Sequence, residues 1–566
     1  MQTTTIMGKL KSLFPISEWL PKYSKSFIRW DLVAGVTLAS FVLPESMAYA
    51  TLAGVPTYYG IYCCLAGGLF FALFTTSRHL AIGPTSSISL MIGSTVAVLS
   101  GGEPGRWAAI AELTALVVAV LCFIAYVFKL SSIVDFISDS ILLGFKAGAA
   151  LSIMSTQLPK LFGVEGGGSN FFTRIWTLLE NLDKTNITVL VFGIVAMGFL
   201  VAGDIFFKGR PVSLVVVVAA ILIMSFTNLA SAGVHITGMI PDGLPDFSRP
   251  SLRFRDINGV LELAFACFLM GYIETISAAR TFAMKNNYLI NPRQELFALG
   301  AANIVAAFSS AYVVAGGLSQ STVNEKSGAK TPMSLIICSV TLGVILLYFT
   351  FLLKNLPEVI LAVIVLHAVS GLIKIKELKR IRQLSRVEFN IALIAIGGVL
   401  VFGILKGVMI SVVMSLILLI RRTSQPEVAL LGRIGNSGHY SDMTRHPDNI
   451  ITPGILIVRI ESSILYFNAG HILEKINHHL ISSGEDIKLL ILDLSAVPYI
   501  DIAGSKMLLN LAATLNKEGR ETRIVQALSN VREMLRKQGM EEITGHVSRS
   551  STIAETIVEF QGGIDG

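Results

Sequence analysis

The sequence predicts an α-helical polytopic membrane protein with a small α/β domain at its C-terminal end. Of the 566 residues, 53% are hydrophobic and 15% are charged, whereas roughly 25% are charged in a typical soluble domain. The mean hydropathy is +0.67. Apolar runs follow one another from residue 31 to about residue 422 and then stop. Repeated apolar runs of this length indicate an integral membrane protein.

Spans of about 20 residues, shortened where Gly and Pro interrupt them, fit this region roughly fourteen times. The predicted spans start near residues 31, 57, 80, 107, 131, 186, 211, 257, 294, 315, 333, 357, 386 and 404. The connections on one side are mostly basic, above all the segment from Lys374 to Arg386, and those on the other side include Glu180 and Asp183. Because basic loops face the cytoplasm, we expect a multi-pass protein of the plasma (inner) membrane, with both termini cytoplasmic.

Other features exclude several function classes. Residues 1–30 form a basic cytoplasmic segment without the apolar core of a signal peptide. The net charge of +7 follows from membrane topology, so it requires no nucleic-acid partner. No metal cluster, nucleophile elbow or phosphate loop is present, and we therefore predict no cofactor, no metal and no enzyme activity. The cysteines lie in apolar segments and are expected to pack there; they are Cys63, Cys64, Cys122, Cys267 and Cys338.

After the last span, the sequence predicts a polar linker at 423–449 and a soluble domain at 450–562. Ile455 to Ile460, Leu489 to Leu494 and Arg523 to Ala527 have the composition of buried strands. Gly504 to Leu515 and Asn530 to Gln538 have the periodicity of amphipathic helices. Strands that alternate with helices are typical of an α/β domain.

A pattern near residue 80 occurs a second time. Phe74 to Gly83 is matched without gaps by Phe308 to Gly317, at a constant offset of 234 residues. Both copies run from small hydroxyl residues into a glycine break within a long apolar region. Paired interrupted helices in corresponding halves of a membrane protein indicate a transporter binding site.

Each copy supplies the start of a half-helix. Pro84 is suited to the first helical position, and Gly316 and Gly317 serve the second copy. The side chains next to these starts, with Gly83, are Thr85, Ser86, Ser319 and Gln320. Two facing helix N-termini attract an anion without a buried cation. The alternative interpretation is that such clusters are ordinary kinks or close helix contacts.

Each repeat also contains an intramembrane carboxylate. Glu45 in the first span corresponds to Glu274 in the eighth, at an offset of 229 residues. A charge in a span usually faces a cavity or a partner, so we predict that both acids take up protons; the alternative is a structural hydrogen bond. Lys146 is the other charge well inside a span. It neutralises one of the glutamates or snorkels to an interface.

Several motifs closely resemble those of the SulP anion transporters, which include sulfate permeases and the animal relatives prestin and pendrin. The resemblance covers nearly the whole chain, in order. Its motifs are Leu43 to Ala50, Leu52 to Pro56, Tyr59 to Tyr62, Thr76 to Pro84, Asn291 to Leu296 and Gly317 to Pro332. Leu492 to Gly504 resembles part of the STAS domain that these transporters carry at their C-terminus.

The resemblance implies two inverted repeats of seven spans, at about 31–227 and 257–422. It also implies core and gate domains, a homodimer, and an elevator-type alternating-access cycle. In the family the anion lies between the third and tenth half-helices, beside side chains of the first and eighth spans. The residues at these positions are Glu45, Tyr49, Thr85, Ser86, Glu274, Ser319 and Gln320.

The sequence departs from the family pattern at two of these positions. Many members have Gln where this chain has Glu45, and some have Arg where it has Gln320. A divalent anion is then harder to bind unless carboxylates are protonated or Lys146 compensates. We therefore expect proton-coupled uptake, with sulfate as the substrate that the family suggests. Sodium would need several oxygen ligands near Glu274; Ala278, one turn on, supplies no side-chain oxygen, although Ser277 and Thr275 are near.

Alternative functions remain at this point. The chain could be a sodium-coupled transporter of bicarbonate or dicarboxylates, or a membrane scaffold whose STAS domain recruits a cytoplasmic partner. In the STAS segment, bacterial relatives have a phosphorylated Ser or Thr where this chain has Ala503. We expect no phosphorylation switch at that position.

Overall fold

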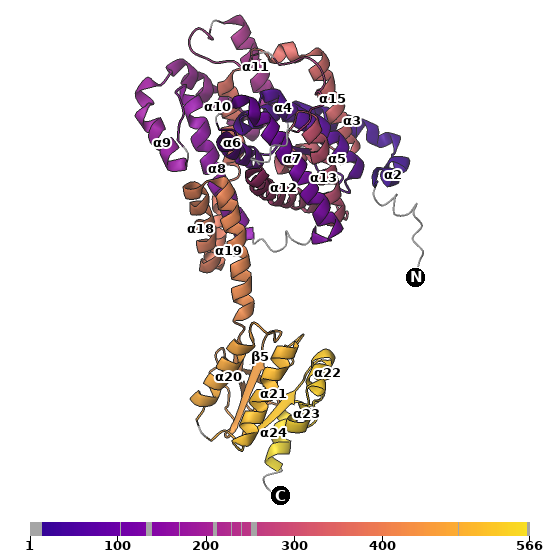
Figure 1. Ribbon diagram of the computed structural model, residues 1–566, viewed down its shortest axis with the longest axis vertical. Coiled ribbons are helices and arrows are strands. Elements are labelled where there is room, and N and C mark those ends of the chain that lie inside the picture. Colours follow the sequence, from indigo (N-terminus) through magenta and orange to yellow (C-terminus); the bar gives the residue numbers. More distant parts are fainter. Residues whose placement is uncertain are drawn as a thin grey trace. The chain divides into compact units, whose positions relative to one another are not determined.

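The computed structural model describes residues 14–101, 103–131, 139–168, 170–207, 212–227, 229–238, 240–250, 257–484 and 486–562. The first 13 residues of the predicted N-terminal segment therefore lie outside the described residues. The chain divides into two compact units, Met1–Ser415 and Leu416–Gly566. We call them the membrane unit and the C-terminal unit, and each is described by itself (Figure 1).

The membrane unit consists of helices whose starts lie at or near the predicted positions. The first half contains α2 (Ile16–Trp19), α3 (Lys25–Ala53), α4 (Thr57–Tyr62), the π-helix η2 (Cys63–Gly67), α5 (Gly68–Phe74), α6 (Ser86–Leu99), α7 (Pro104–Val127), α8 (Asp139–Phe162), α9 (Phe171–Glu180), α10 (Ile187–Phe206) and α11 (Val212–Phe226). The second half contains α12 (Ile257–Lys285), α13 (Pro292–Phe308), α14 (Leu318–Lys326), α15 (Met333–Tyr348), α16 (Glu358–Ser370), α17 (Ile375–Leu384), α18 (Arg386–Phe402) and the first part of α19 (Ile404–Ser424), which continues into the C-terminal unit.

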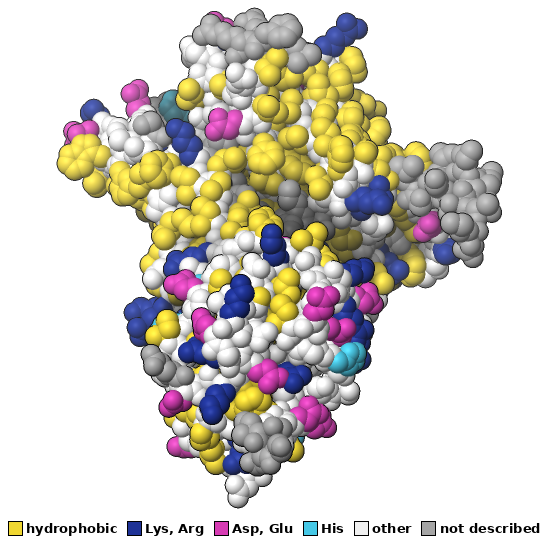
Figure 2. Space-filling model, turned by 60° about the horizontal axis from the view of Figure 1, so that its bottom comes forward, with side chains coloured by type: hydrophobic (Ala, Val, Ile, Leu, Met, Phe, Trp, Pro, Cys, Tyr) yellow, Lys and Arg dark blue, Asp and Glu magenta, His cyan; other side chains and the backbone are white. Residues whose placement is uncertain are grey.

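Length and composition make seven of the described helical segments suitable for crossing a membrane. Three shorter apolar helices are α6, α11 and α15. Large hydrophobic side chains are exposed on α10 and α11, among them Phe199 and Val215. Figure 2 shows hydrophobic side chains spread over the membrane unit, while charged side chains of both signs are interspersed on the C-terminal unit. An apolar outer surface is what lipid contact requires.

The helices of the membrane unit pack in two groups. In one group, α13 packs on α7, α15 on α3, and α12 on α7. In the other, α8 packs on α18 and α16, and α10 packs on α16. The groups meet where α16 and α11 contact α3, so α3, which carries Glu45, is the central helix of the unit.

The third and tenth spans differ from their predicted starts at residues 80 and 315. Their helices begin later, at Ser86 and Leu318. The residues before them form two short strands, β1 (Ile82–Gly83) and β2 (Ala315–Gly316). The helices α9 and α17 were not predicted as separate elements, because apolar length was the criterion and both are short amphipathic helices in connections.

The C-terminal unit is a five-stranded sheet covered by helices, which confirms the predicted α/β class. Its strands are β3 (Val428–Arg433), β4 (Tyr440–Asp442), β5 (Ile455–Ile460), β6 (Leu489–Asp493) and β7 (Glu521–Val525), in the order β4-β3-β5-β6-β7. Its helices are α20 (Ala469–Ser482), α21 (Ile502–Lys517), α22 (Ser529–Lys537), α23 (Glu541–Thr544) and α24 (Ile553–Gly562).

Alternation along the strands divides the core of this unit between the two faces of the sheet. Leu456 and Val458 of β5 pack on one face with side chains of α20, α21 and α22. Ile455 and Ile457 pack on the other face with Ile553 of α24. Side chains of a strand point alternately to opposite faces, and both faces are covered, so the central strands are apolar throughout.

The predicted linker at 423–449 contains part of this sheet. β3 pairs antiparallel with β5, and β4 pairs with β3. The expectation that this stretch is only a linker is therefore wrong. Its polar residues lie in the turns and at the sheet edge, whereas Val428 and Leu431 of β3 are buried.

We predict that Asp501→Ala destabilises the C-terminal unit by roughly 1–3 kcal/mol, because two backbone N–H groups lose their acceptor. Asp501 caps α21 by accepting from the Gly504 N–H at 2.8 Å, and its other oxygen accepts from the Tyr466 N–H at 2.7 Å. The change is measured by heating the full chain and using limited proteolysis of the C-terminal unit to detect its unfolding. The control is Asp486→Ala, at an exposed position; equal effects of the two substitutions would contradict the capping role.

Candidate functional site

The candidate site is built around two short extended segments, β1 and β2, which lie side by side. We call this pair of segments the crossing. β1 and β2 pair antiparallel, with Ile82 opposite Gly316. α6 follows β1 and α14 follows β2, so both helices start beside the crossing. A Cβ atom at Gly316 would lie 2.9 Å from the Cα atom of Thr275, closer than real Cβ contacts allow. Glycine at this position thus lets the crossing lie against α12.

Side chains from other helices hold the crossing together. Thr275 Oγ1 accepts from the Gly316 N–H at 2.8 Å, and Ser321 Oγ accepts from the Ala81 N–H at 2.9 Å. The carboxamide of Asn303 on α13 bonds both the N–H and the carbonyl of Val314, each at 3.0 Å. These backbone groups are buried and lie outside regular helices, so the side chains supply the partners that they need.

The two half-helices start without side-chain caps. Their first backbone bonds are those from the N–H groups of Ser89 and Ser321. Within the described residues, the three preceding N–H groups of each helix have no acceptor. Unsatisfied N–H groups and the positive end of the helix dipole form an anion-binding arrangement.

Glu45 of α3 is the carboxylate at the centre of this arrangement. Its Oε1 accepts from the Tyr49 hydroxyl at 3.0 Å and from the Ser319 hydroxyl at 3.2 Å, and its Oε2 accepts from Gln320 Nε2 at 3.1 Å. Glu45 is 2% exposed and Gln320 is 1% exposed, whereas Ser319 is exposed. The carboxylate therefore lies at the buried end of an accessible polar surface.

Gln320 also connects the two half-helices. Its Nε2 lies 3.3 Å from the carbonyl oxygen of Pro84 and donates to it as well as to Glu45. Its Oε1 is buried and has no hydrogen-bond partner among the described residues. A buried amide oxygen without a donor is costly, so this atom is available for a protonated group or a water molecule.

Glu274 of α12 is the second carboxylate. Its Oε1 accepts from the Ser87 hydroxyl at 3.1 Å. Its Oε2 and Oγ1 of Thr85 are buried and have no hydrogen-bond partner among the described residues. Lys146 on α8 is half-buried and lies near enough to Glu274 for the two charges to interact, so it stays a candidate counter-charge.

The structure brings together the residues that the sequence singled out. Thr85 is the residue before α6, Ser86 is its first residue, and the Ser86 hydroxyl lies beside that of Tyr49. Gly83 belongs to β1, Gly316 to β2, and Gly317 precedes α14. The prediction that Pro84 takes the first helical position is wrong, because α6 starts at Ser86 and Pro84 lies in the extended stretch between β1 and Thr85. The polar contacts to the carboxylates come from Tyr49, Ser87, Ser319 and Gln320.

Sequence reasoning missed four residues of the site. Ser87 bonds Glu274, while Thr275, Ser321 and Asn303 bond the extended segments. Thr275 and Ser321 follow predicted site residues directly, so one further step along each helix would have included them. Asn303 gave a weaker signal, one amide within the otherwise apolar residues 296–308 of α13.

Comparison with known proteins identifies the family. The profile of the Sulfate permease family matches residues 28–395, and that of the STAS domain matches residues 446–559. The chain belongs to the sulfate permease family. This confirms the resemblance in the sequence, and the membrane fold with a C-terminal STAS domain that it implied. The family is one of transporters rather than enzymes.

Individual relatives of the sulfate permease family match over most of their length. The chain is 29% identical to the High affinity sulfate transporter 1 of Stylosanthes hamata, over 97% of this chain and 86% of the relative. It is 30% identical to the Sulfate transporter 4.1, chloroplastic, of Arabidopsis thaliana, over 95% of this chain and 81% of the relative.

Solved structures share the fold at lower sequence identity. A structure of murine Solute Carrier 26 family member A9 in the inward-facing state matches with a TM-score of 0.90 and 22% identity, and covers 99% of this chain and 96% of the other. The transmembrane domain of the cyanobacterial bicarbonate transporter BicA matches with a TM-score of 0.60 and 21% identity, and covers 69% of this chain and 98% of the other. The match to murine Solute Carrier 26 family member A9 extends over nearly the whole chain, which confirms the predicted helical polytopic membrane fold.

We predict that Thr275→Val lowers the stability of the membrane unit by roughly 1–3 kcal/mol, because the buried Gly316 N–H loses its acceptor while the side-chain volume stays the same. The melting temperature of the purified protein in detergent measures the loss. Thr281→Val is the matched control, since the exposed Thr281 hydroxyl bonds only the Ser277 carbonyl of its own helix. If Thr281→Val lowers the melting temperature as much, the hydrogen bond between Thr275 and the Gly316 N–H has no special role.

Proposed function

We propose that this protein is a secondary active transporter that moves an inorganic oxyanion, sulfate in particular, together with protons. Its membership of the sulfate permease family and relatives named sulfate transporters support the substrate. The observation that carries the proposal is the hydrogen bonding of Glu45, which accepts from Tyr49, Ser319 and Gln320. These donors lie beside the open N-terminus of α14, where an anion would bind.

An ionised Glu45 competes with the substrate for the same donors. Its negative charge also repels a divalent anion at short range, and burial strengthens that repulsion. Protonation removes the charge and turns one carboxyl oxygen into a hydrogen-bond donor. Proton uptake and anion binding at one site are thereby coupled, because each favours the other.

Glu274 provides a second protonation site on the opposite half-helix. It has one hydrogen bond, from Ser87, and one oxygen without a described partner. Sodium is a weaker candidate for this position, since the neighbouring Thr275 hydroxyl already bonds Gly316 and Gly271. The free oxygen atoms that remain here, Glu274 Oε2 and Thr85 Oγ1, are fewer than the several oxygen ligands that sodium needs.

The remaining parts of the proposal concern movement and assembly. We place the protein in the plasma (inner) membrane as a homodimer with cytoplasmic termini, and assign it an elevator-type cycle of alternating access. The two helix groups support a moving core and a static gate, and the basic connections support the orientation. The exposed Ser319 beside the buried Glu45 supports access to the site from one side.

We expect uptake of labelled sulfate into proteoliposomes to increase as the external pH falls below the internal pH. External protons then neutralise Glu45 and Glu274, and the neutral site binds the anion more tightly. Glu45→Gln should make the site permanently neutral. It should keep sulfate binding but reduce the response to an imposed pH gradient by roughly tenfold or more, equivalent to about 1.4 kcal/mol of lost coupling.

The control for this experiment is Glu377→Gln, since Glu377 lies on the amphipathic helix α17 away from the site. It should transport like the unmodified protein. A sodium gradient applied at equal pH on both sides forms the second arm. Uptake that follows sodium and ignores pH would overturn proton coupling, and uptake of bicarbonate or dicarboxylates but not sulfate would overturn the substrate.

A further inference from the structure

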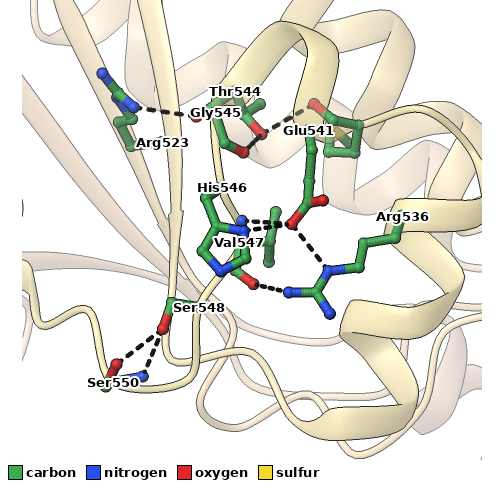
Figure 3. A network of polar contacts seen from close by, with 10 residues as sticks. Arg523, Arg536, Glu541, Thr544, Gly545, His546, Val547, Ser548 and Ser550 are labelled. Atoms are coloured by element: carbon green, nitrogen blue, oxygen red, sulfur yellow. Dashed lines mark hydrogen bonds and ion pairs between the residues drawn. The ribbon is translucent and has the colours of Figure 1, made fainter.

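The C-terminal unit contains a basic pocket that the transport site does not involve. It is lined by Arg532, Arg536, His546, Ser548, Arg549 and Ser550, and its volume is about 480 Å³. Two arginines come from α22, and the other residues come from the segment between α23 and α24. Figure 3 shows this segment turning back beside the arginine side of α22.

One arginine of the pocket is held in a fixed position. Arg536 Nε donates to Glu541 Oε1 at 2.9 Å, and its Nη2 donates to the Val547 carbonyl at 3.1 Å. The Val547 N–H also donates to Glu541. The Arg536 and Val547 hydrogen bonds hold the pKa of Glu541 below its usual value, so this carboxyl is ionised at neutral pH. A guanidinium that is already ordered loses less entropy when a ligand binds.

A second arginine of the pocket, Arg549, is free to contact a ligand. Among the described residues, none forms a hydrogen bond or ion pair with the exposed Arg549. The hydroxyls of Ser548 and Ser550 lie 2.8 Å apart and bond each other. Three arginines line the pocket, and among them Glu541 pairs with Arg536 alone in the described residues, so the two positive charges of Arg532 and Arg549 are not neutralised by it. This excess matches the charge of a divalent oxyanion.

We propose that this pocket binds a dianionic oxyanion group, sulfate or phosphate, which Arg536 and Arg549 contact through their guanidinium groups while a serine hydroxyl donates to a third oxygen. Planar guanidinium groups match the spacing of two oxygens of such an anion and form strong charge-assisted hydrogen bonds with it. The pocket also has room for a larger molecule that carries this group, since ligand pockets typically span roughly 300–1,000 Å³. The proposal goes beyond transport, because it concerns a separate site in the STAS domain.

A fluorescent reporter on the full chain tests this proposal. The native cysteines are all buried, so Lys537→Cys, at an exposed position on α22, can be labelled selectively with an environment-sensitive dye. The labelled protein in detergent is titrated with sodium sulfate, sodium phosphate and glycerol phosphate at constant ionic strength. Sodium chloride is the control for screening.

A saturable response to at least one of the three dianions, and none to chloride, is the expected result. Tighter binding of glycerol phosphate than of the inorganic anions would identify a phosphate monoester as the ligand, and the reverse would identify the free anion. Arg549→Gln should weaken binding roughly tenfold, which corresponds to about 1.4 kcal/mol. Arg445→Gln is the matched control, since Arg445 is an exposed arginine in the turn that follows β4.

Two results would overturn the proposal. One is the absence of a saturable response to all three dianions, and the other is equal affinity of the unmodified protein and Arg549→Gln. The same titration with Gln320→Ala separates this site from transport, because loss of the transport site should leave the reporter signal unchanged. A failed uptake experiment with an intact reporter response would contradict the proposed transport alone.

Discussion

Two extended segments, β1 and β2, pair backbone to backbone in the middle of the membrane unit, and the arrangement of the site depends on that pairing. Backbone in an apolar surrounding must find hydrogen-bond partners, so non-helical segments persist at this depth only where protein supplies them. Here the partners are the opposite segment and the side chains of Thr275, Ser321 and Asn303. The pairing fixes the point from which both half-helices start.

The electrostatics of the site follow from this geometry. Two helix N-termini favour a negative charge at the crossing, while Glu45 and Glu274 place negative charges beside it. In the described structure, Glu45 accepts hydrogen bonds from Tyr49, Ser319 and Gln320, so these three donors have an acceptor within the protein. A fixed cation in place of Gln320 would bind an anion without this competition, but it would give no reason for a proton to travel with the anion.

The sequence predicted most of the fold and much of the site because both leave local signals. Apolar length located the spans, and the repeated glycine break located the crossing to within a few residues. The strands β1 and β2 were missed because two-residue strands have no periodicity. The side chains that bond the extended segments, which we call the braces, were missed because contacts such as that between Asn303 and Val314 form only in the folded chain. The strands β3 and β4 were assigned to a linker because their short sequences are surrounded by polar turns.

The braces at the crossing also have a mechanical consequence. Thr275 belongs to α12, Ser321 to α14 and Asn303 to α13, so three helices are tied to the same few residues of extended backbone. To slide one half-helix past the other would break several buried hydrogen bonds at once, at a cost of roughly 1–3 kcal/mol for each unsatisfied group. The two half-helices therefore move as one rigid body. Conformational changes that admit or release an ion are confined to the contacts between this body and the helices around it.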